Sequence, residues 1–344
     1  MPLPPISPPL INSSNPWATT AEDLQHLVDC PHTGAVTTRT SLLQAFDHNP
    51  AIHQHTFFNP HSHSLKPSDV SDGEVPADYS ASLNTLGYSP IPLSTYLALL
   101  PQIPQNSPLP PATRSTKPFI LSVTGTPAEV RTCYHQIRTA QTSIQNPLCM
   151  EINLSCPNIP DKPPPAYSGA ALSEYLRVLS EERGMLVEGG RRVAVGVKTP
   201  PFTYLEQFRT LIDALLGSCK PGCPVDFITA TNTLGSCLVL AGDEVGVGVG
   251  GGAPPAISSA TGEGIWGMAG SALHPLALGN VRTIRGMLDG YEELMGVDVI
   301  GVGGVGGKGG YERMRAVGAK VVGVGTALGR EGVEVFGRIL EGKE

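Results

Sequence analysis

The sequence predicts an α/β fold, a single (β/α)8 barrel (TIM barrel) over residues 1–344, with its active site at the C-terminal ends of the strands. Three observations lead to this prediction. Eight short, nearly continuous apolar runs recur along the 344 residues, and helical patterns lie between or after them. Apolar residues make up 40% of the chain, enough for one large core. Strands apolar throughout favour a parallel sheet covered on both faces, and eight strand–helix units close most naturally into a barrel. A doubly wound open sheet is the structural alternative.

Each predicted strand combines β-branched and other apolar residues over a few positions, as expected for a buried strand. In chain order, the predicted strands are Pro9–Asn12, Gly34–Thr38, Phe119–Val123, Met150–Leu154, Val193–Lys198, Asp226–Thr231, Asp298–Val302 and Lys320–Val324. The predicted helices have apolar residues at helical spacing. They are Ala21–Cys30, Leu93–Leu100, Pro127–Thr142, Ser168–Arg183, Thr203–Leu216, Pro275–Asp289, Gly310–Val317 and Glu331–Glu341.

Three segments lack this periodicity and are predicted to be surface-loop excursions, at residues 47–76, 101–118 and 242–256. The first holds five histidines: His48, His53, His55, His61 and His63. Their His-x-His spacing could hold a metal ion, but we interpret the segment as a solvated loop and predict no metal site. The second is rich in proline, as expected for an extended surface connection. The third is rich in glycine, and no helix follows it at phosphate-loop spacing.

The charge balance and the cysteines restrict the class of protein. The chain has 30 acidic and 23 basic residues, a formal net charge of −7, which disfavours a nucleic-acid partner. No apolar run is long enough to span a membrane, and the N-terminus lacks the pattern of a signal peptide. Seven scattered cysteines suit a reducing compartment. We therefore expect a cytoplasmic protein without a membrane partner.

Two glycine turns follow the last two predicted strands. Gly303 and Gly304 follow the seventh strand, and Gly325 and Thr326 follow the eighth. In a (β/α)8 barrel, the backbone N–H groups at these two positions commonly bind a phosphate. One such turn alone could simply permit a tight strand-to-helix connection. Two adjacent turns favour a phosphate site.

The other strand ends present one lysine, several amides and one thiol. Lys198 ends a buried strand, where an unpaired ammonium is costly, so it should meet an anion or an electron-rich ligand. A flavin ring fits this expectation, and a Schiff-base lysine is the competing interpretation. Asn84, Asn153, Asn158 and Asn232 each offer a donor and an acceptor, which suits a pyrimidine ring better than a sugar. Cys156 could be a nucleophile, a general base or an ordinary buried thiol.

At these residues the sequence resembles the dihydroorotate dehydrogenase family, specifically its soluble class 1A type. The most specific match is Asn-Leu-Ser-Cys-Pro-Asn-Ile-Pro-Asp-Lys-Pro at residues 153–163. Further matches are Ser-Leu-Asn-Thr-Leu-Gly from Ser82, Gly-Val-Lys-Thr-Pro-Pro from Gly196, Thr-Asn-Thr-Leu-Gly from Thr231, His-Pro-Leu-Ala-Leu-Gly-Asn-Val from His274 and Gly-Thr-Ala-Leu from Gly325. The resemblance covers roughly residues 9–340.

The resemblance implies an FMN enzyme of pyrimidine biosynthesis that oxidises dihydroorotate to orotate. Cys156 would be the base that removes the C5 proton while the C6 hydride passes to flavin N5. The substrate would be bound by Arg39, Asn84, Asn153, Asn158, Asn232 and Thr233, with the N–H groups of Leu86, Gly87 and Tyr88 at its carboxylate. FMN would be held by Ser14, Asn15, Arg39, Thr40, Asn153, Lys198, Thr231, Gly270, Gly303, Gly304, Gly325 and Thr326.

The resemblance also implies fumarate as the electron acceptor and a homodimer. Cys156 in place of a serine base, and no N-terminal membrane segment, favour the fumarate-using type over the quinone-using class. Three residues depart from the family pattern: Arg39 stands for a lysine, Asn15 for a glycine and Val302 for a threonine. Arg39 leaves open a related FMN oxidoreductase acting on another pyrimidine. Two further alternatives are a flavin-binding paralogue with little turnover and a Schiff-base aldolase, which would be colourless.

Overall fold

Eight parallel strands form the central sheet of the protein. In the computed structural model, which describes residues 3–156, 158, 163–184, 191–220, 222–241 and 253–342, the sheet order is β1-β12-β11-β8-β7-β6-β5-β2. These strands are β1 (Leu10–Asn12), β2 (Val36–Thr37), β5 (Phe119–Val123), β6 (Leu148–Asn153), β7 (Ala194–Thr199), β8 (Phe227–Ala230), β11 (Asp298–Val302) and β12 (Val321–Val324). A parallel bridge between Ile11 and Ala35 joins the two ends of the sheet. The predicted barrel is therefore confirmed, and the open-sheet alternative is wrong.

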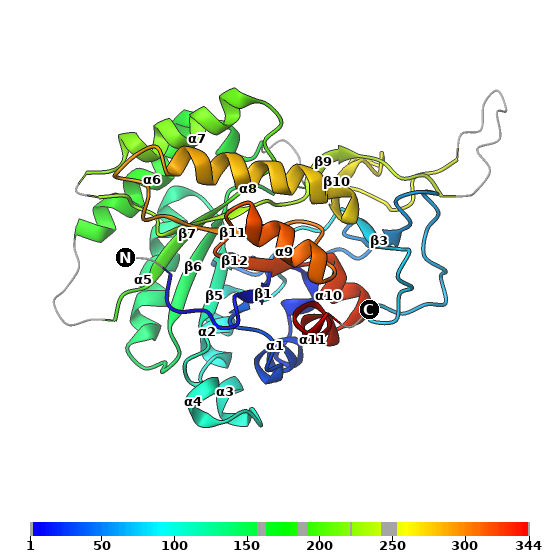
Figure 1. Cartoon of the computed structure of the whole chain (residues 1–344), viewed down its shortest axis with the longest axis horizontal. Helices are drawn as coiled ribbons and strands as arrows, with labels where there is room; N and C mark the ends of the chain where they lie inside the picture. Colours follow the sequence, from blue (N-terminus) through cyan, green and yellow to red (C-terminus); the bar gives the residue numbers. More distant parts are fainter. Residues whose placement is uncertain are drawn as a thin grey trace.

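Helices surround the barrel, with α6, α7 and α8 on one side of it and α1 and α11 on the other (Figure 1). The eight predicted helices are all present with small changes at their ends. They are α1 (Ala21–Asp29), α2 (Leu93–Leu99), α5 (Pro127–Gln141), α6 (Gly169–Gly184), α7 (Leu205–Gly217), α8 (His274–Leu288), α9 (Lys308–Ala316) and α11 (Glu334–Glu341). Helix α10 (Thr326–Glu331), which is separated from the end of β12 by Gly325 alone, was not predicted. Short 3-10 turns lie at Pro16–Ala18 (η1), Pro165–Tyr167 (η2) and Ser271–Leu273 (η3).

The barrel interior is apolar at the N-terminal ends of the strands and polar at their C-terminal ends. Ile120, Cys149 and Phe227 belong to the apolar interior cluster. The ring of Phe227 fills the space beside Gly196, because a Cβ atom on that glycine would lie 2.3 Å from the ring. This packed lower layer leaves the upper layer of the barrel for the site, as is usual in this fold.

A second sheet, antiparallel and not predicted, has the strand order β3-β4-β10-β9. Its strands are β3 (His55–Phe58), β4 (Ala81–Asn84), β9 (Leu234–Cys237) and β10 (Trp266–Gly270). Since β9 begins just after β8 ends, the second sheet stands at the C-terminal end of the barrel, and Figure 1 shows β3, β9 and β10 together beside it. Strand β3 corrects the prediction of a solvated loop over residues 47–76, because Phe57 and Phe58 are buried.

The other two predicted excursions have different outcomes. Residues 101–118 contain two one-turn helices, α3 (Ile103–Asn106) and α4 (Pro111–Arg114), so the prediction of an extended connection is wrong there. Both helices have proline in their first turn, where a missing N–H costs nothing. Of the third excursion, residues 242–252 lie outside the described part of the chain. In the residues that the structure describes, no helix is both long and apolar enough to cross a membrane.

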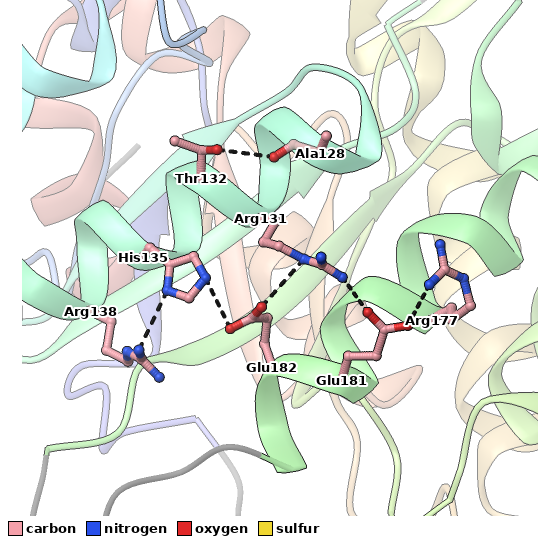
Figure 2. Close-up of polar contacts among 8 residues, drawn as sticks. All are labelled: Ala128, Arg131, Thr132, His135, Arg138, Arg177, Glu181 and Glu182. Atoms are coloured by element: carbon pink, nitrogen blue, oxygen red, sulfur yellow. Dashed lines mark hydrogen bonds and ion pairs between the residues drawn. The ribbon is translucent and has the colours of Figure 1, made fainter.

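Helices α5 and α6, which flank β6, are joined by a network of ion pairs (Figure 2). The buried carboxylate of Glu182 forms an ion pair with Arg131, 3.3 Å from its Nε, and lies 3.2 Å from His135 Nε2. Arg131 also pairs with Glu181, which in turn pairs with Arg177. None of these residues lines the cavity described below. The network therefore holds two helices together outside the site.

Candidate active site

One cavity at the C-terminal ends of the barrel strands contains every residue that the sequence singled out for the site. It encloses about 1000 Å³ of empty space, part of it open to solvent. The predicted residues that line it are Ser14, Asn15, Arg39, Thr40, Asn84, Leu86, Gly87, Tyr88, Asn153, Cys156, Asn158, Lys198, Thr231, Asn232, Thr233, Gly270, Gly303, Gly304, Gly325 and Thr326.

Cys156 follows β6 and lies partly exposed in this cavity. Burial raises the pKa of its thiol, while hydrogen bonds from the Asn158 backbone and the Tyr88 side chain lower it. Burial also raises the pKa of the Tyr88 phenol, so the phenol stays protonated and can donate to sulfur. The sequence assigned only the backbone of Tyr88 to the site, and its side chain is therefore an addition from the structure.

Lys198 is the penultimate residue of β7 and is only 3% exposed. Its ammonium donates to Ser13 Oγ at 2.9 Å. Burial lowers the pKa of Lys198, and the negative charge of Glu151, two positions before the end of β6, acts in the opposite direction. Glu151 is itself buried and accepts from Thr229 Oγ1 at 2.6 Å. Lys198 is thus a buried cation, and its described hydrogen bond goes to the neutral hydroxyl of Ser13. Such a cation suits a ligand with negative charge.

The four asparagines form two hydrogen-bonded pairs of amides. Asn158 Nδ2 donates to Asn84 Oδ1 at 2.8 Å, and Asn232 Nδ2 donates to Asn153 Oδ1 at 3.3 Å. These bonds fix which edge of each amide faces the cavity. They join residues from β4, β6 and the turn after β8, which confirms that the predicted residues come together in space.

Several buried polar atoms in the cavity wall have no hydrogen-bond partner among the described residues. They include Asn15 Oδ1, Asn158 Oδ1 and Thr231 Oγ1. Buried polar atoms are nearly always satisfied in native proteins, so these atoms point to a polar ligand. The glycine turns give a second indication, because a Cβ atom on Gly325 would meet nothing within 4 Å. This turn therefore faces open space.

Arg39 lies just after β2 and is nearly buried. Its guanidinium donates to the carbonyl oxygen of Gly87 at 3.2 Å. Burial lowers the pKa of Arg39, but a guanidinium keeps its charge in proteins. Gly87 is covered by Phe46, whose ring would lie 2.2 Å from a Cβ atom at that position. Arg39 thus places a positive charge beside the backbone of the Leu86–Tyr88 segment.

The structure adds cavity residues that the sequence did not indicate, namely Ser13, Pro16, Trp17, His55, Ser82, Ala269, Leu273 and Val302. His55 comes from the second sheet, and its Nε2 lies 2.7 Å from Asp72 Oδ2. Trp17 Nε1 donates to the same oxygen at 3.0 Å. The sequence could not distinguish His55 from the four other histidines of its segment. What sets it apart is the contact with Asp72, which depends on the fold.

Comparison with known proteins gives a consistent result. The family model described as dihydroorotate dehydrogenase matches residues 74–343. A Trypanosoma cruzi protein named dihydroorotate dehydrogenase (fumarate) is 32% identical over 226 residues, which cover 65% of this chain and 62% of that protein. The chain thus spans about six-tenths of this relative. A Streptococcus agalactiae protein named putative dihydroorotate dehydrogenase A (fumarate) is 26% identical over 335 residues, or 96% of this chain and 86% of that protein.

Solved structures agree on the fold. The ligand-free DHODH of Eimeria tenella has a TM-score of 0.68 and 18% sequence identity, covering 97% of this chain and 82% of that chain. At this identity the likeness shows the barrel architecture alone.

Proposed function

The chain belongs to the dihydroorotate dehydrogenase family, and from this premise we propose that it oxidises dihydroorotate to orotate with FMN as its cofactor. The observation that carries the proposal is the composition of one cavity. Cys156, Lys198, the four asparagines and two glycine turns all line it, although they come from distant parts of the chain. This reaction needs a base, a cation near the flavin, amides that bind the pyrimidine and a site for the FMN phosphate. The cavity offers a candidate for each of them.

The residues present in the cavity fit FMN. The unpartnered oxygens of Asn15 and Thr231 and the open space at Gly325 leave room and polar groups for a ligand. The ring and ribityl chain would contact Ser14, Asn15, Arg39, Thr40, Asn153, Lys198, Thr231 and Gly270. The phosphate would be held by the phosphate cradle, which we define as Gly303, Gly304, Gly325 and Thr326. When bound, FMN supplies a ring that accepts a hydride.

The chain's own contribution to the chemistry is a base held at the substrate. Cys156 Sγ, as a thiolate, would take the proton from C5 of dihydroorotate. The Tyr88 hydroxyl and the Asn158 N–H would stabilise the negative sulfur, because both lower the pKa of the thiol. The positive charges of Lys198 and Arg39 act in the same direction. Loss of the C5 proton and the C6 hydride produces the C5–C6 double bond of orotate.

Substrate recognition would use the amides and Arg39. The donors and acceptors of Asn84, Asn153, Asn158, Asn232 and Thr233 would match the C=O and N–H groups of the pyrimidine ring. The N–H groups of Leu86, Gly87 and Tyr88 would bind the carboxylate, with Arg39 beside them. Because Arg39 is wider than the lysine expected at this position, a related pyrimidine is a second candidate substrate.

We further propose fumarate as the acceptor, a homodimeric assembly and a cytoplasmic location. The names of the two curated relatives, which both specify fumarate, support the acceptor. Turnover of dihydroorotate with fumarate should exceed turnover with a quinone analogue, and sedimentation should give twice the mass of the chain. A preference for the quinone would contradict the assignment of the acceptor.

The cofactor assignment is tested by releasing the ligand with heat and identifying it by chromatography. The expected product is non-covalent FMN. If FAD is released, or if no flavin binds after reconstitution, the proposed function is wrong. A colourless protein that forms a borohydride-reducible adduct at Lys198 would instead favour the aldolase alternative.

A further inference from the structure

His274 is a buried residue directly behind the phosphate cradle that neither the sequence nor the comparisons assign to it. It is the first residue of α8 and is 8% exposed. It packs directly against the cradle, because a Cβ atom on Gly304 would lie 2.7 Å from His274 Cβ. The imidazole lies between the turn after β11 and helix α9.

The hydrogen bonds of this imidazole determine its protonation. Arg313 Nε lies 3.2 Å from His274 Nε2, and His274 Nδ1 lies 2.7 Å from the carbonyl oxygen of Gly303. Arginine Nε is always a donor, so Nε2 must accept. A carbonyl oxygen can only accept, so Nδ1 must carry the proton. His274 is therefore a neutral imidazole in its Nδ1–H form. Burial and the charge of Arg313 both lower the pKa of His274, which agrees with this state.

The bond to Gly303 has a consequence for the next peptide group. The Gly303–Gly304 peptide is trans, and in a trans peptide the C=O and N–H groups point in opposite directions. When His274 holds the Gly303 carbonyl, the Gly304 N–H is turned away from the imidazole. Both glycines line the cavity, and their φ angles are positive, at 140° for Gly303 and 68° for Gly304. Because glycine adopts many backbone conformations, the peptide between them could rotate unless another group holds it.

Building on the proposed function, we propose that His274 is a positioning residue of the phosphate cradle. Its Nδ1–H fixes the Gly303 carbonyl so that the Gly304 N–H faces the phosphate, and Arg313 fixes the tautomer that makes this possible. Arg313 acts without touching the ligand, through a single imidazole. The group that the phosphate cradle would bind is the phosphate monoester of the flavin.

The test compares two flavins that differ only in the phosphate. Dissociation constants of FMN and riboflavin are measured with the flavin-free full-length chain, by fluorescence titration. His274→Leu removes the donor to Gly303 while keeping apolar bulk, and His274→Asn keeps a donor at the position of Nδ1. Arg313→Met removes the donor to Nε2, and Arg282→Met on the exposed side of α8 is its matched control. Circular dichroism checks that each variant is folded.

His274→Leu should weaken FMN binding by about tenfold to a hundredfold, the effect of one hydrogen bond to a charged group, and leave riboflavin within about twofold. His274→Asn should keep FMN affinity within about threefold of wild type. Arg313→Met should weaken FMN severalfold, and ¹⁵N spectra of its imidazole should show mixed tautomers, whereas wild type and Arg282→Met show the Nδ1–H form alone.

Two results would overturn the proposal while leaving the proposed function intact. One is wild-type FMN affinity in folded His274→Leu. The other is an equal loss of FMN and riboflavin, which would indicate a general structural role. If the wild-type chain binds neither flavin, the proposed function and this inference both fall.

Discussion

The guanidinium of Arg39 donates a hydrogen bond to the carbonyl oxygen of Gly87 at 3.2 Å. This bond connects the end of β2 with the segment after β4, whose N–H groups we assign to the substrate carboxylate. We propose that this buried cation has two roles, ordering the segment and attracting the substrate carboxylate. Both can be tested by replacing the side chain.

Arg39→Ala should weaken the binding of orotate much more than the binding of uracil, which has no carboxylate. A hydrogen bond to a charged group is worth about 1.5–3 kcal/mol, so the loss should be about tenfold to a hundredfold. Calorimetric titration of both ligands measures it. Equal affinity for orotate in wild type and Arg39→Ala would show that Arg39 does not contact the carboxylate.

Arg39→Lys distinguishes the two candidate substrates. If dihydroorotate is the substrate, the variant restores the residue expected at this position and should retain or improve turnover. If another pyrimidine is the substrate, the variant should impair its turnover while dihydroorotate remains poor in both proteins. Steady-state rates with a panel of dihydropyrimidines separate these outcomes.

Cys156→Ala should bind FMN and orotate but reduce its flavin far more slowly with dihydroorotate. A positioned general base contributes about 10²–10⁴-fold, which sets the expected loss. Cys156→Ser should keep partial activity that grows at high pH, because a hydroxyl is a weaker base than a thiol. Cys219→Ala, outside the cavity, is the control. A wild-type rate of flavin reduction in Cys156→Ala would exclude this residue as the base.

Tyr88→Phe should move the pH dependence of flavin reduction to higher pH. Burial already raises the pKa of Cys156, and the phenol lowers it by hydrogen bonding, so removing the phenol raises it further. The shift should be about one pH unit, the free energy of one such bond. Rates from pH 6 to 10 measure it, with the exposed Tyr204→Phe as the control. An unchanged profile would mean that the phenol does not act on the thiolate.

Glu182→Gln should lower the free energy of unfolding without changing flavin affinity. Glu182 is buried, whereas Arg131 and His135 are about two-fifths exposed, so solvent screening limits the cost to about 1–3 kcal/mol. Glu206→Gln, which breaks an exposed pair with Arg209, should cost less than about 0.5 kcal/mol. Urea unfolding measures both. An equal cost for the two variants would contradict the structural role of the α5–α6 network.

The barrel could be predicted because each of its strands is marked by a short run of neighbouring apolar residues. Each strand is an apolar run, as in Phe119–Val123 and Asp298–Val302, whose predicted bounds are those of β5 and β11. Residues at strand ends, such as Lys198 and Asn153, then come together by the geometry of the barrel alone. For this reason the predicted site residues all line one cavity.

The second sheet could not be predicted, because its pairing is non-local. Strand β4 pairs with β10 almost two hundred residues later, with Asn84 opposite Gly267. Each of its strands is short, and His55 lies in a segment whose histidines and prolines obscure the buried Phe57 and Phe58. The phenol of Tyr88 was missed for a similar reason, since its position beside Cys156 depends on where two loops meet.

The most direct test of the proposed function is anaerobic mixing of the flavin-loaded protein with dihydroorotate while flavin absorbance is recorded. If the chain oxidises dihydroorotate, the oxidised flavin band should bleach and one orotate should form for each flavin reduced. Subsequent addition of fumarate should restore the band. A flavin that stays oxidised with dihydroorotate, although dithionite bleaches it, would contradict the proposed function.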